Sequence, residues 1–168
     1  MIRAILACDD LGGVSKAGTM PWPKNPKDLR WFKKNTTDGV VVMGSTTWED
    51  PLMPGPLPNR KNILVTTRKK DYPGAHEYVE GVLDREIQHI AKKNKEKTTW
   101  VIGGPNIINQ LLGAIEEFYL SRIPGDYSCD TFLPIKKIEQ LFEKTWTENH
   151  EEVEFQIWKK RKNGETIS

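Results

Sequence analysis

Three segments of the chain place residues that can bind phosphate directly after an apolar run. They are Ser45-Thr46-Thr47, Thr66-Thr67-Arg68 and Gly103-Gly104-Pro105. Each is expected to join a strand to a helix, where unpaired N–H groups and the positive end of the helix dipole favour an anion. Such junctions could together hold one dinucleotide. Each one alone is ordinary in α/β proteins, and the paired glycines lack the full spacing of a Rossmann fingerprint.

The apolar pattern predicts the strands that lead into these junctions. Near-continuous apolar runs at Ile2–Cys8, Gly39–Gly44, Asn62–Val65 and Thr99–Ile102 are typical of buried strands in a parallel sheet.

Helices are expected between the strands. Asn25 is placed to cap a helix that has Pro26 in its first turn. Ser45 and Glu49 suit the opening of a short helix, and Asp84–Lys93 has helical spacing. A further helix follows the paired glycines. This alternation favours an α/β sheet covered by helices.

The C-terminal part of the chain changes character. Glu117–Ile123 and Glu152–Trp158 are strand-like and are separated by turns and polar loops rather than by helices. They are predicted to form an antiparallel pair at the edge of the sheet.

Length and composition indicate one globular domain. The chain has 168 residues, of which 37% are hydrophobic and 29% charged, and this suits a core of ordinary size. No apolar run approaches the roughly 20 residues that span a bilayer. Cys8 and Cys129 fit a reducing compartment, so a cytoplasmic location is expected, and no Cys or His cluster has metal-ligand spacing. The net charge of +2, with interleaved signs, argues against a nucleic-acid partner.

Two neighbouring segments carry a more specific signal. Thr19-Met20-Pro21-Trp22 and Pro26–Thr36 closely resemble the dihydrofolate reductase family. Further segments match that family in the same order along the chain: Val42–Gly44 with Thr47-Trp48, Pro56–Pro58 with Arg60–Asn62, Val101–Gly104, and Asp130-Thr131. The resemblance runs from Met1 to about Pro134, and the ordered set is far more specific than any one segment.

The resemblance implies both a fold and an activity. The expected fold is one α/β domain over residues 1–168, with a central, mostly parallel eight-stranded sheet, an antiparallel C-terminal edge strand and about four flanking helices. The implied reaction reduces 7,8-dihydrofolate to 5,6,7,8-tetrahydrofolate by hydride transfer from NADPH to C6 and protonation of N5. It would supply one-carbon metabolism and the synthesis of thymidylate and purines. A monomer that binds neither nucleic acid nor membranes is expected.

The family motif assigns Asp28 to the hydrogen bonds that hold the 2-amino group and N3 of the pteridine. A carboxylate accepts two parallel hydrogen bonds from such an amidine-like edge. In a pocket with Leu29 and Phe32, desolvation would raise the pKa of Asp28, which could then help to supply a proton. Taken alone, Asp28 could instead stabilise the start of its helix, by roughly 0.3–1 kcal/mol.

The resemblance also implies a mobile lid at residues 9–24. Reduction requires aligned rings and restricted access of water. Met20 and Trp22 are assigned as catalytic lid residues over the reacting rings, and Gly12, Gly13 and Gly18 would be flexible points. A glycine cluster of this kind also marks ordinary turns.

Further substrate contacts follow from the resemblance. Arg60 matches the anchor of the substrate's glutamate α-carboxylate, which suits a planar guanidinium, although a solvated surface arginine is the alternative. Some of the other positions also suit core packing. The expected substrate-binding residues are Ile5, Ala7, Asp28, Leu29, Phe32, Leu57, Arg60, Ile102 and Ser121.

The cofactor site is expected at the same junctions that could bind phosphate. Thr47 would meet the pyrophosphate at its helix start, and Gly103 and Gly104, joined by a cis peptide, would let the dinucleotide backbone approach closely. The expected cofactor-binding residues are Ala7, Val14, Gly44, Ser45, Thr46, Thr47, Thr66, Thr67, Arg68, Ile102, Gly103, Gly104, Pro105, Asn106 and Ile107.

The chain departs from the family pattern at a few positions. Relatives usually carry one or two basic residues after Gly44, where this chain has Ser45-Thr46, so the choice between NADPH and NADH is left open at this point. Arg68 stands where several relatives contact the 2′-phosphate of NADPH, and it could take over the role of the missing basic residues. Ile108 replaces a frequent aromatic residue, and Cys129 replaces a common glycine. Both changes bear on rates rather than on the reaction.

Two rival functions stay open. A related reductase of flavin synthesis, acting on a ribosylated aminopyrimidine, would need a phosphate site near Arg60, and the motif around Asp28 argues against it. A non-catalytic protein that binds pteridines and nucleotides is the other rival. The presence of Asp28, Met20 and Gly103-Gly104 together favours catalysis.

Overall fold

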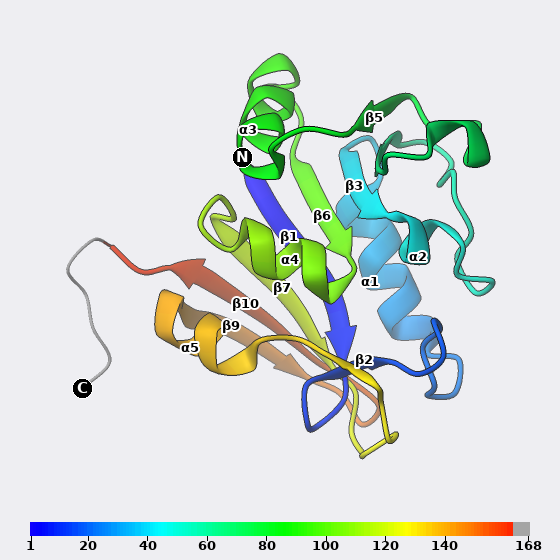
Figure 1. Cartoon of the computed structure of the whole chain (residues 1–168). Coiled ribbons are helices and arrows are strands. Elements are labelled where there is room, and N and C mark those ends of the chain that lie inside the picture. Colours follow the sequence, from blue (N-terminus) through cyan, green and yellow to red (C-terminus); the bar gives the residue numbers. More distant parts are fainter. Residues whose placement is uncertain (163–168) are drawn as a thin grey trace.

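The computed structural model of the chain describes residues 1–162, which are arranged around an eight-stranded sheet (Figure 1). Residues 163–168 of the expected domain lie outside the described residues. The strand order is β5-β4-β3-β6-β1-β7-β10-β9. The strands are β1 (Ile2–Cys8), β3 (Val40–Gly44), β4 (Lys61–Val65), β5 (Glu77–Val79), β6 (Thr99–Gly103), β7 (Glu117–Arg122), β9 (Phe142–Asn149) and β10 (Glu154–Lys160).

The directions of the strands confirm the predicted fold class. From β5 to β7 the strands are parallel, and the C-terminal strand β10 runs antiparallel to its neighbours. The expected antiparallel pairing of the segments near residues 117–123 and 152–158 is confirmed, since β7 pairs with β10. That pair does not end the sheet, however. The apolar pattern does not predict β9, which pairs outside β10.

The α-helices within residues 1–162 number five, where about four were expected, and none is long and apolar enough to cross a membrane. They are α1 (Pro26–Thr36), α2 (Ser45–Trp48), α3 (Leu83–Lys93), α4 (Pro105–Leu111) and α5 (Ile135–Leu141). A second, two-stranded sheet joins β2 (Gly13–Ser15) to β8 (Thr131–Phe132).

Each central strand contributes to two apolar layers, because successive side chains point to opposite faces of a sheet. On one face, Val40 and Val42 belong to the layer that includes α3, α4 and α5. On the other face, Val41 and Ile5 pack in a layer with Phe32 of α1. In Figure 1, α4 lies in front of the sheet and α1 lies behind it. The sheet therefore presents Ile5 to the same side as α1.

The start of α1 is fixed as predicted. The side chain of Asn25 accepts a hydrogen bond from the backbone N–H of Asp28 at 3.1 Å, and Pro26 lies in the first turn. The cap and the proline together hold Asp28 at a fixed place on the helix.

The predicted junction at Ser45 is confirmed, because α2 begins there directly after β3, but its expected capping and the junction after β4 need correction. α2 has Gly44 at its N-cap position, and neither Ser45 nor Glu49 caps its start through a side chain. The reason is that β3 runs directly into the helix, so Ser45 already lies in the first turn. After β4, the expected helix is only the 3₁₀ turn η1 (Lys69–Asp71), because the chain leaves the strand through a turn in which Thr66 Oγ1 accepts the N–H of Arg68.

The unpredicted strand β9 still contributes to the core through its first residue. Phe142 is fully buried and packs edge-to-face against Phe118 of β7, with ring centroids 6.3 Å apart. Phe142→Ala is expected to lower the free energy of unfolding by about 3–5 kcal/mol, because it leaves a cavity. Urea denaturation followed by circular dichroism measures this change.

The matched control is Leu141→Ala, next to it in the chain, whose side chain is exposed. This control is expected to cost less than about 1 kcal/mol. Equal losses for the two variants would contradict the assignment of Phe142 to the core.

Candidate active site

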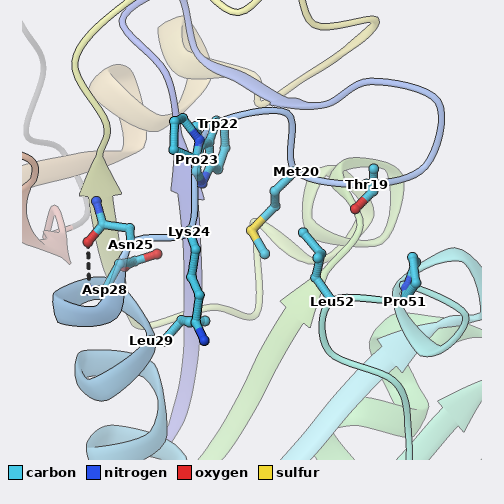
Figure 2. Close-up of a pocket in the computed structure, with 10 residues that line it drawn as sticks. All are labelled: Thr19, Met20, Trp22, Pro23, Lys24, Asn25, Asp28, Leu29, Pro51 and Leu52. Atoms are coloured by element: carbon cyan, nitrogen blue, oxygen red, sulfur yellow. Dashed lines mark hydrogen bonds between the residues drawn. The ribbon is translucent and has the colours of Figure 1, made fainter.

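A cleft of about 560 Å³ opens between the start of α1, the segment 19–24 and the loop after α2 (Figure 2). Figure 2 shows Met20 reaching from the lid segment toward the middle of the cleft, with Asp28 on one side and Leu52 on the other. The lining residues are Thr19, Met20, Trp22, Pro23, Lys24, Asn25, Asp28, Leu29, Pro51 and Leu52.

A smaller cavity of about 50 Å³ shares Met20, Asp28 and Leu29 with this cleft. Its other lining residues are Ile5, Leu6, Ala7, Phe32, Met53, Ile102 and Ser121. The structure therefore brings together the three residues predicted to be catalytic and most of those predicted to bind substrate. Leu57 and Arg60 line neither of these two cavities.

Asp28 lies where the two cavities meet and is 9% exposed. Burial raises the pKa of its carboxyl above the ordinary value, and a hydrogen bond with the Ser121 side chain opposes that rise. Ser121 reaches this place because the parallel pairing of β1 with β7 sets it beside Ala7. The site thus holds a carboxyl that keeps its proton to a higher pH than an exposed aspartate does.

The predicted lid lies across the mouth of the cleft, and hydrogen bonds hold its tip on both sides. On one side, the backbone N–H of Ala17 donates to Asp130 at 2.9 Å. On the other side, Thr19 Oγ1 donates to Asp50 Oδ1 at 3.0 Å. Between these hydrogen bonds the chain turns at Ala17 and Gly18, both with positive φ. This turn directs the chain back over the cleft, where Met20 follows Thr19.

Arg60 is held beside the ring of Phe32, at the far end of α1. Its Nε donates to the carbonyl of Pro58 at 2.9 Å, and its Nη1 donates to Oγ1 of Thr36 at 3.0 Å. The guanidinium carbon lies 5.9 Å from the centre of the Phe32 ring. Burial lowers the pKa of Arg60 from its ordinary value, but a guanidinium stays charged at physiological pH. Its position is therefore fixed before any ligand binds.

The three predicted phosphate-binding junctions meet at one edge of the sheet, because β4, β3 and β6 are adjacent and parallel. The Gly103–Gly104 peptide bond is cis, which confirms the prediction, and Gly103 has a φ of +137°. A Cβ atom on Gly103 would lie 2.9 Å from Oγ1 of Thr47. The backbone of one junction therefore lies directly against the hydroxyl of another. Val14, also predicted for the cofactor, is instead buried with Leu133 in the apolar layer.

Arg68 lies at the same edge but is already engaged in local contacts. Its Nη2 donates to the hydroxyl of Tyr72 at 2.9 Å, and its Nε lies 3.8 Å from the carboxylate of Asp71. Both members of this ion pair are more than half exposed, so the pair is weak and open to competition.

Several residues of the site were not predicted from the sequence. Leu52 lines the large cleft and Met53 the small cavity, and both come from the proline-rich loop at residues 51–58. Leu52 is 59% exposed. The sequence held no specific signal for these two residues, because single apolar side chains are common on protein surfaces.

Comparisons with known proteins agree on one family. The model of the dihydrofolate reductase family matches residues 1–161. A dihydrofolate reductase of Haloferax volcanii is 35% identical over 134 residues, which cover 77% of this chain and 69% of that protein. One from Buchnera aphidicola subsp. Baizongia pistaciae is 34% identical over 167 residues, covering 95% of this chain and 98% of the relative. The solved structure of dihydrofolate reductase from Enterococcus faecalis, complexed with NADP(H) and RAB-propyl, superposes with a TM-score of 0.81 at 30% identity, covering 96% and 97% of the two chains.

Asp28→Asn is expected to raise the Tm of the ligand-free protein at pH 7 and to change it little near pH 3. Folding raises the pKa of Asp28 above its unfolded value of about 3.9, so stability falls as the pH rises through the interval between the two values. Asparagine carries no charge and escapes this cost. Thermal melting of both proteins across this pH range measures the difference, and a lower Tm of the variant at pH 7 would contradict the raised pKa.

Proposed function

This chain belongs to the dihydrofolate reductase family, and we propose that it reduces 7,8-dihydrofolate to 5,6,7,8-tetrahydrofolate with NADPH. When bound, NADPH supplies the hydride that is added to C6 of the pteridine, while N5 receives a proton. The observation that carries the proposal is the buried carboxyl of Asp28 where the two cavities meet, beside Met20. A desolvated carboxyl at the bottom of an apolar cleft suits a flat ring that has donors along one edge.

Asp28 binds and orients the pteridine in this proposal. Its carboxylate accepts hydrogen bonds from the 2-amino group and from N3, which fixes the plane of the ring in the small cavity. Ile5, Ala7 and Phe32 supply the apolar walls. Because burial raises its pKa, Asp28 also holds a proton nearer to neutral pH and helps to deliver it to the site.

The junctions at the sheet edge fit a dinucleotide. The evidence for this fit is the contact of the bare Gly103 backbone with Thr47, where a side chain on the glycine would collide with the hydroxyl. Thr47 and the start of α4 would hold the pyrophosphate. Gly103 and Gly104 have no side chains and would leave room for the backbone of the dinucleotide. Thr66, Thr67 and Arg68 would take the adenosine end.

The lid excludes water from the reacting rings. Met20 lines both cavities, and Trp22 closes the large one at its upper end. Exclusion of water strengthens the hydrogen bonds of Asp28 and protects the reduced ring. Arg60 anchors the substrate's α-carboxylate, for which its fixed guanidinium beside Phe32 is suited.

For the molecule as a whole, we propose a cytoplasmic, monomeric enzyme with one domain over residues 1–168 and with no nucleic-acid or membrane partner. The support is the single large sheet, the small net charge of +2 and the free state of Cys8 and Cys129.

Asp28→Asn is expected to lower turnover of dihydrofolate by at least about tenfold near neutral pH, a barrier change of roughly 1.4 kcal/mol. The reason is that an amide offers one acceptor and one donor to a ring edge that presents donors only. Oxidation of NADPH that depends on dihydrofolate, followed by absorbance, measures the effect.

Asp38→Asn is the control, because Asp38 is exposed and remote from both cavities. Its turnover is expected to match that of the native chain. Identical kinetics for all three proteins would remove the assigned role of Asp28. A native chain that binds both ligands tightly without oxidising NADPH would instead be a non-catalytic binding protein.

Arg68→Ala is expected to reduce the preference for NADPH over NADH by about tenfold, since a hydrogen bond to a charged group contributes about 1.5–3 kcal/mol. Ratios of kcat/KM for the two cofactors measure this preference. Lys70→Ala removes one positive charge from the same turn and is the control. An unaltered ratio in Arg68→Ala would show that the 2′-phosphate is recognised elsewhere.

A further inference from the structure

The carboxylate of Asp9 is fully buried just beyond the end of β1 and accepts hydrogen bonds from two different loops. Its Oδ1 accepts the backbone N–H groups of Leu11 at 2.9 Å and Gly13 at 2.8 Å, at the root of the lid. Its Oδ2 accepts the backbone N–H of Tyr127 at 3.1 Å and the thiol of Cys129 at 3.6 Å. One side chain therefore joins the lid to the loop after β7.

This joint leaves little freedom where the two loops meet. A Cβ atom on Gly13 would lie 2.5 Å from the Cβ of Cys129 and 3.0 Å from Oδ1 of Asp9. Burial opposes ionisation of Asp9, but the hydrogen bonds of Tyr127, Gly13, Leu11 and Cys129 outweigh it and hold the pKa below its ordinary value. A buried charge that depends on four donors is strongly destabilised when its partners move away.

Two routes lead from Asp9 to the cleft, one along the lid through Gly13 and one through Tyr127 of the loop after β7. On the first route, Gly13 begins β2, which pairs with β8 before the chain turns toward Met20. On the second route, the ring of Tyr127 packs edge-to-face on Trp22, with ring centroids 5.9 Å apart. Met20 and Trp22, the two lid residues assigned to the reacting rings, both line the large cleft. A shift at Asp9 would therefore reach both of them.

We propose that Asp9 is a positioning residue, which acts through Gly13 and Tyr127 to hold Met20 and Trp22 over the reacting rings. The inference rests on the proposed function, because it assigns the lid a part in the reduction. Asp9 itself lines neither cavity.

The test compares Asp9→Asn and Asp9→Ser with the native chain and with Asp10→Asn. Asp10 is the matched control, because it is exposed and accepts one backbone N–H, that of Gly125, from the same loop. The first readout is the single-turnover rate constant of hydride transfer, which does not depend on the fraction of folded protein. The second is amide hydrogen exchange of the ligand-free proteins, which requires no reaction.

For both Asp9 variants, hydride transfer is expected to slow by about tenfold, since small misplacements of positioning groups carry costs of this order. The hydrogen-bonded lid amides of Ala17 and Thr19 are expected to exchange faster, while those of Ile87 and Ile90 in α3 keep their native rates. Asp10→Asn is expected to stay within about twofold of the native chain in both readouts.

A different pattern would overturn the proposal. If the Asp9 variants lose protection throughout the molecule but transfer hydride at the native rate, Asp9 serves only stability. Should neither variant fold, hydrogen exchange of the native chain provides the test. The amides of Gly13, Tyr127, Ala17 and Thr19 are expected to open as one unit, and independent opening contradicts the proposed link. If the native chain does not reduce dihydrofolate, the proposed function fails while the exchange result still reports on the role of Asp9.

Discussion

The parallel pairing of β4, β3, β6 and β1 is the constraint on which the whole site depends. Strands that run in the same direction end at the same edge of a sheet, and loops or helices must begin there. Residues far apart in the chain, such as Ala7, Thr47 and Gly103, are thus brought to the same end of the sheet. The apolar layers on both faces hold the strands in register, so the positions of the site residues follow from the packing of residues that do no chemistry.

Asp28 destabilises the ligand-free fold, and it is also the residue to which the binding of the pteridine is assigned. The residue is buried, its carboxyl is desolvated, and a hydrogen bond with the Ser121 side chain offsets part of this cost. A ligand with two donors along one edge relieves this unfavourable state, whereas an apolar side chain at position 28 would remove it altogether. The sheet thus has two opposite effects on Asp28. Its apolar side chains disfavour the ionised carboxylate, and the hydroxyl of Ser121 on β7 stabilises it.

The sequence was most informative where one physical signal dominated. Continuous apolar runs such as Val40–Gly44 located the central strands, and the pairing of Asn25 with Pro26 located the start of α1. The family motif then identified Asp28, Met20 and Trp22, which do meet at one cleft. The apolar pattern failed where the signal was weak: seven of the eight residues of β9 are exposed, and Phe142 is the one buried residue of the strand. Contacts such as Thr19 with Asp50 depend on how loops fold over the sheet, which no local pattern encodes.

The central place of β1 in the sheet has a consequence for how the chain is made. β1 leaves the ribosome long before its partners β6 and β7, which begin only at Thr99 and Glu117. Until then its apolar residues, Ala4 and Ile5 among them, have no native strand to pair with. Long-range pairings of this kind close late and leave apolar segments exposed during synthesis. The chain must therefore keep β1 from pairing with other chains until β6 and β7 have been made.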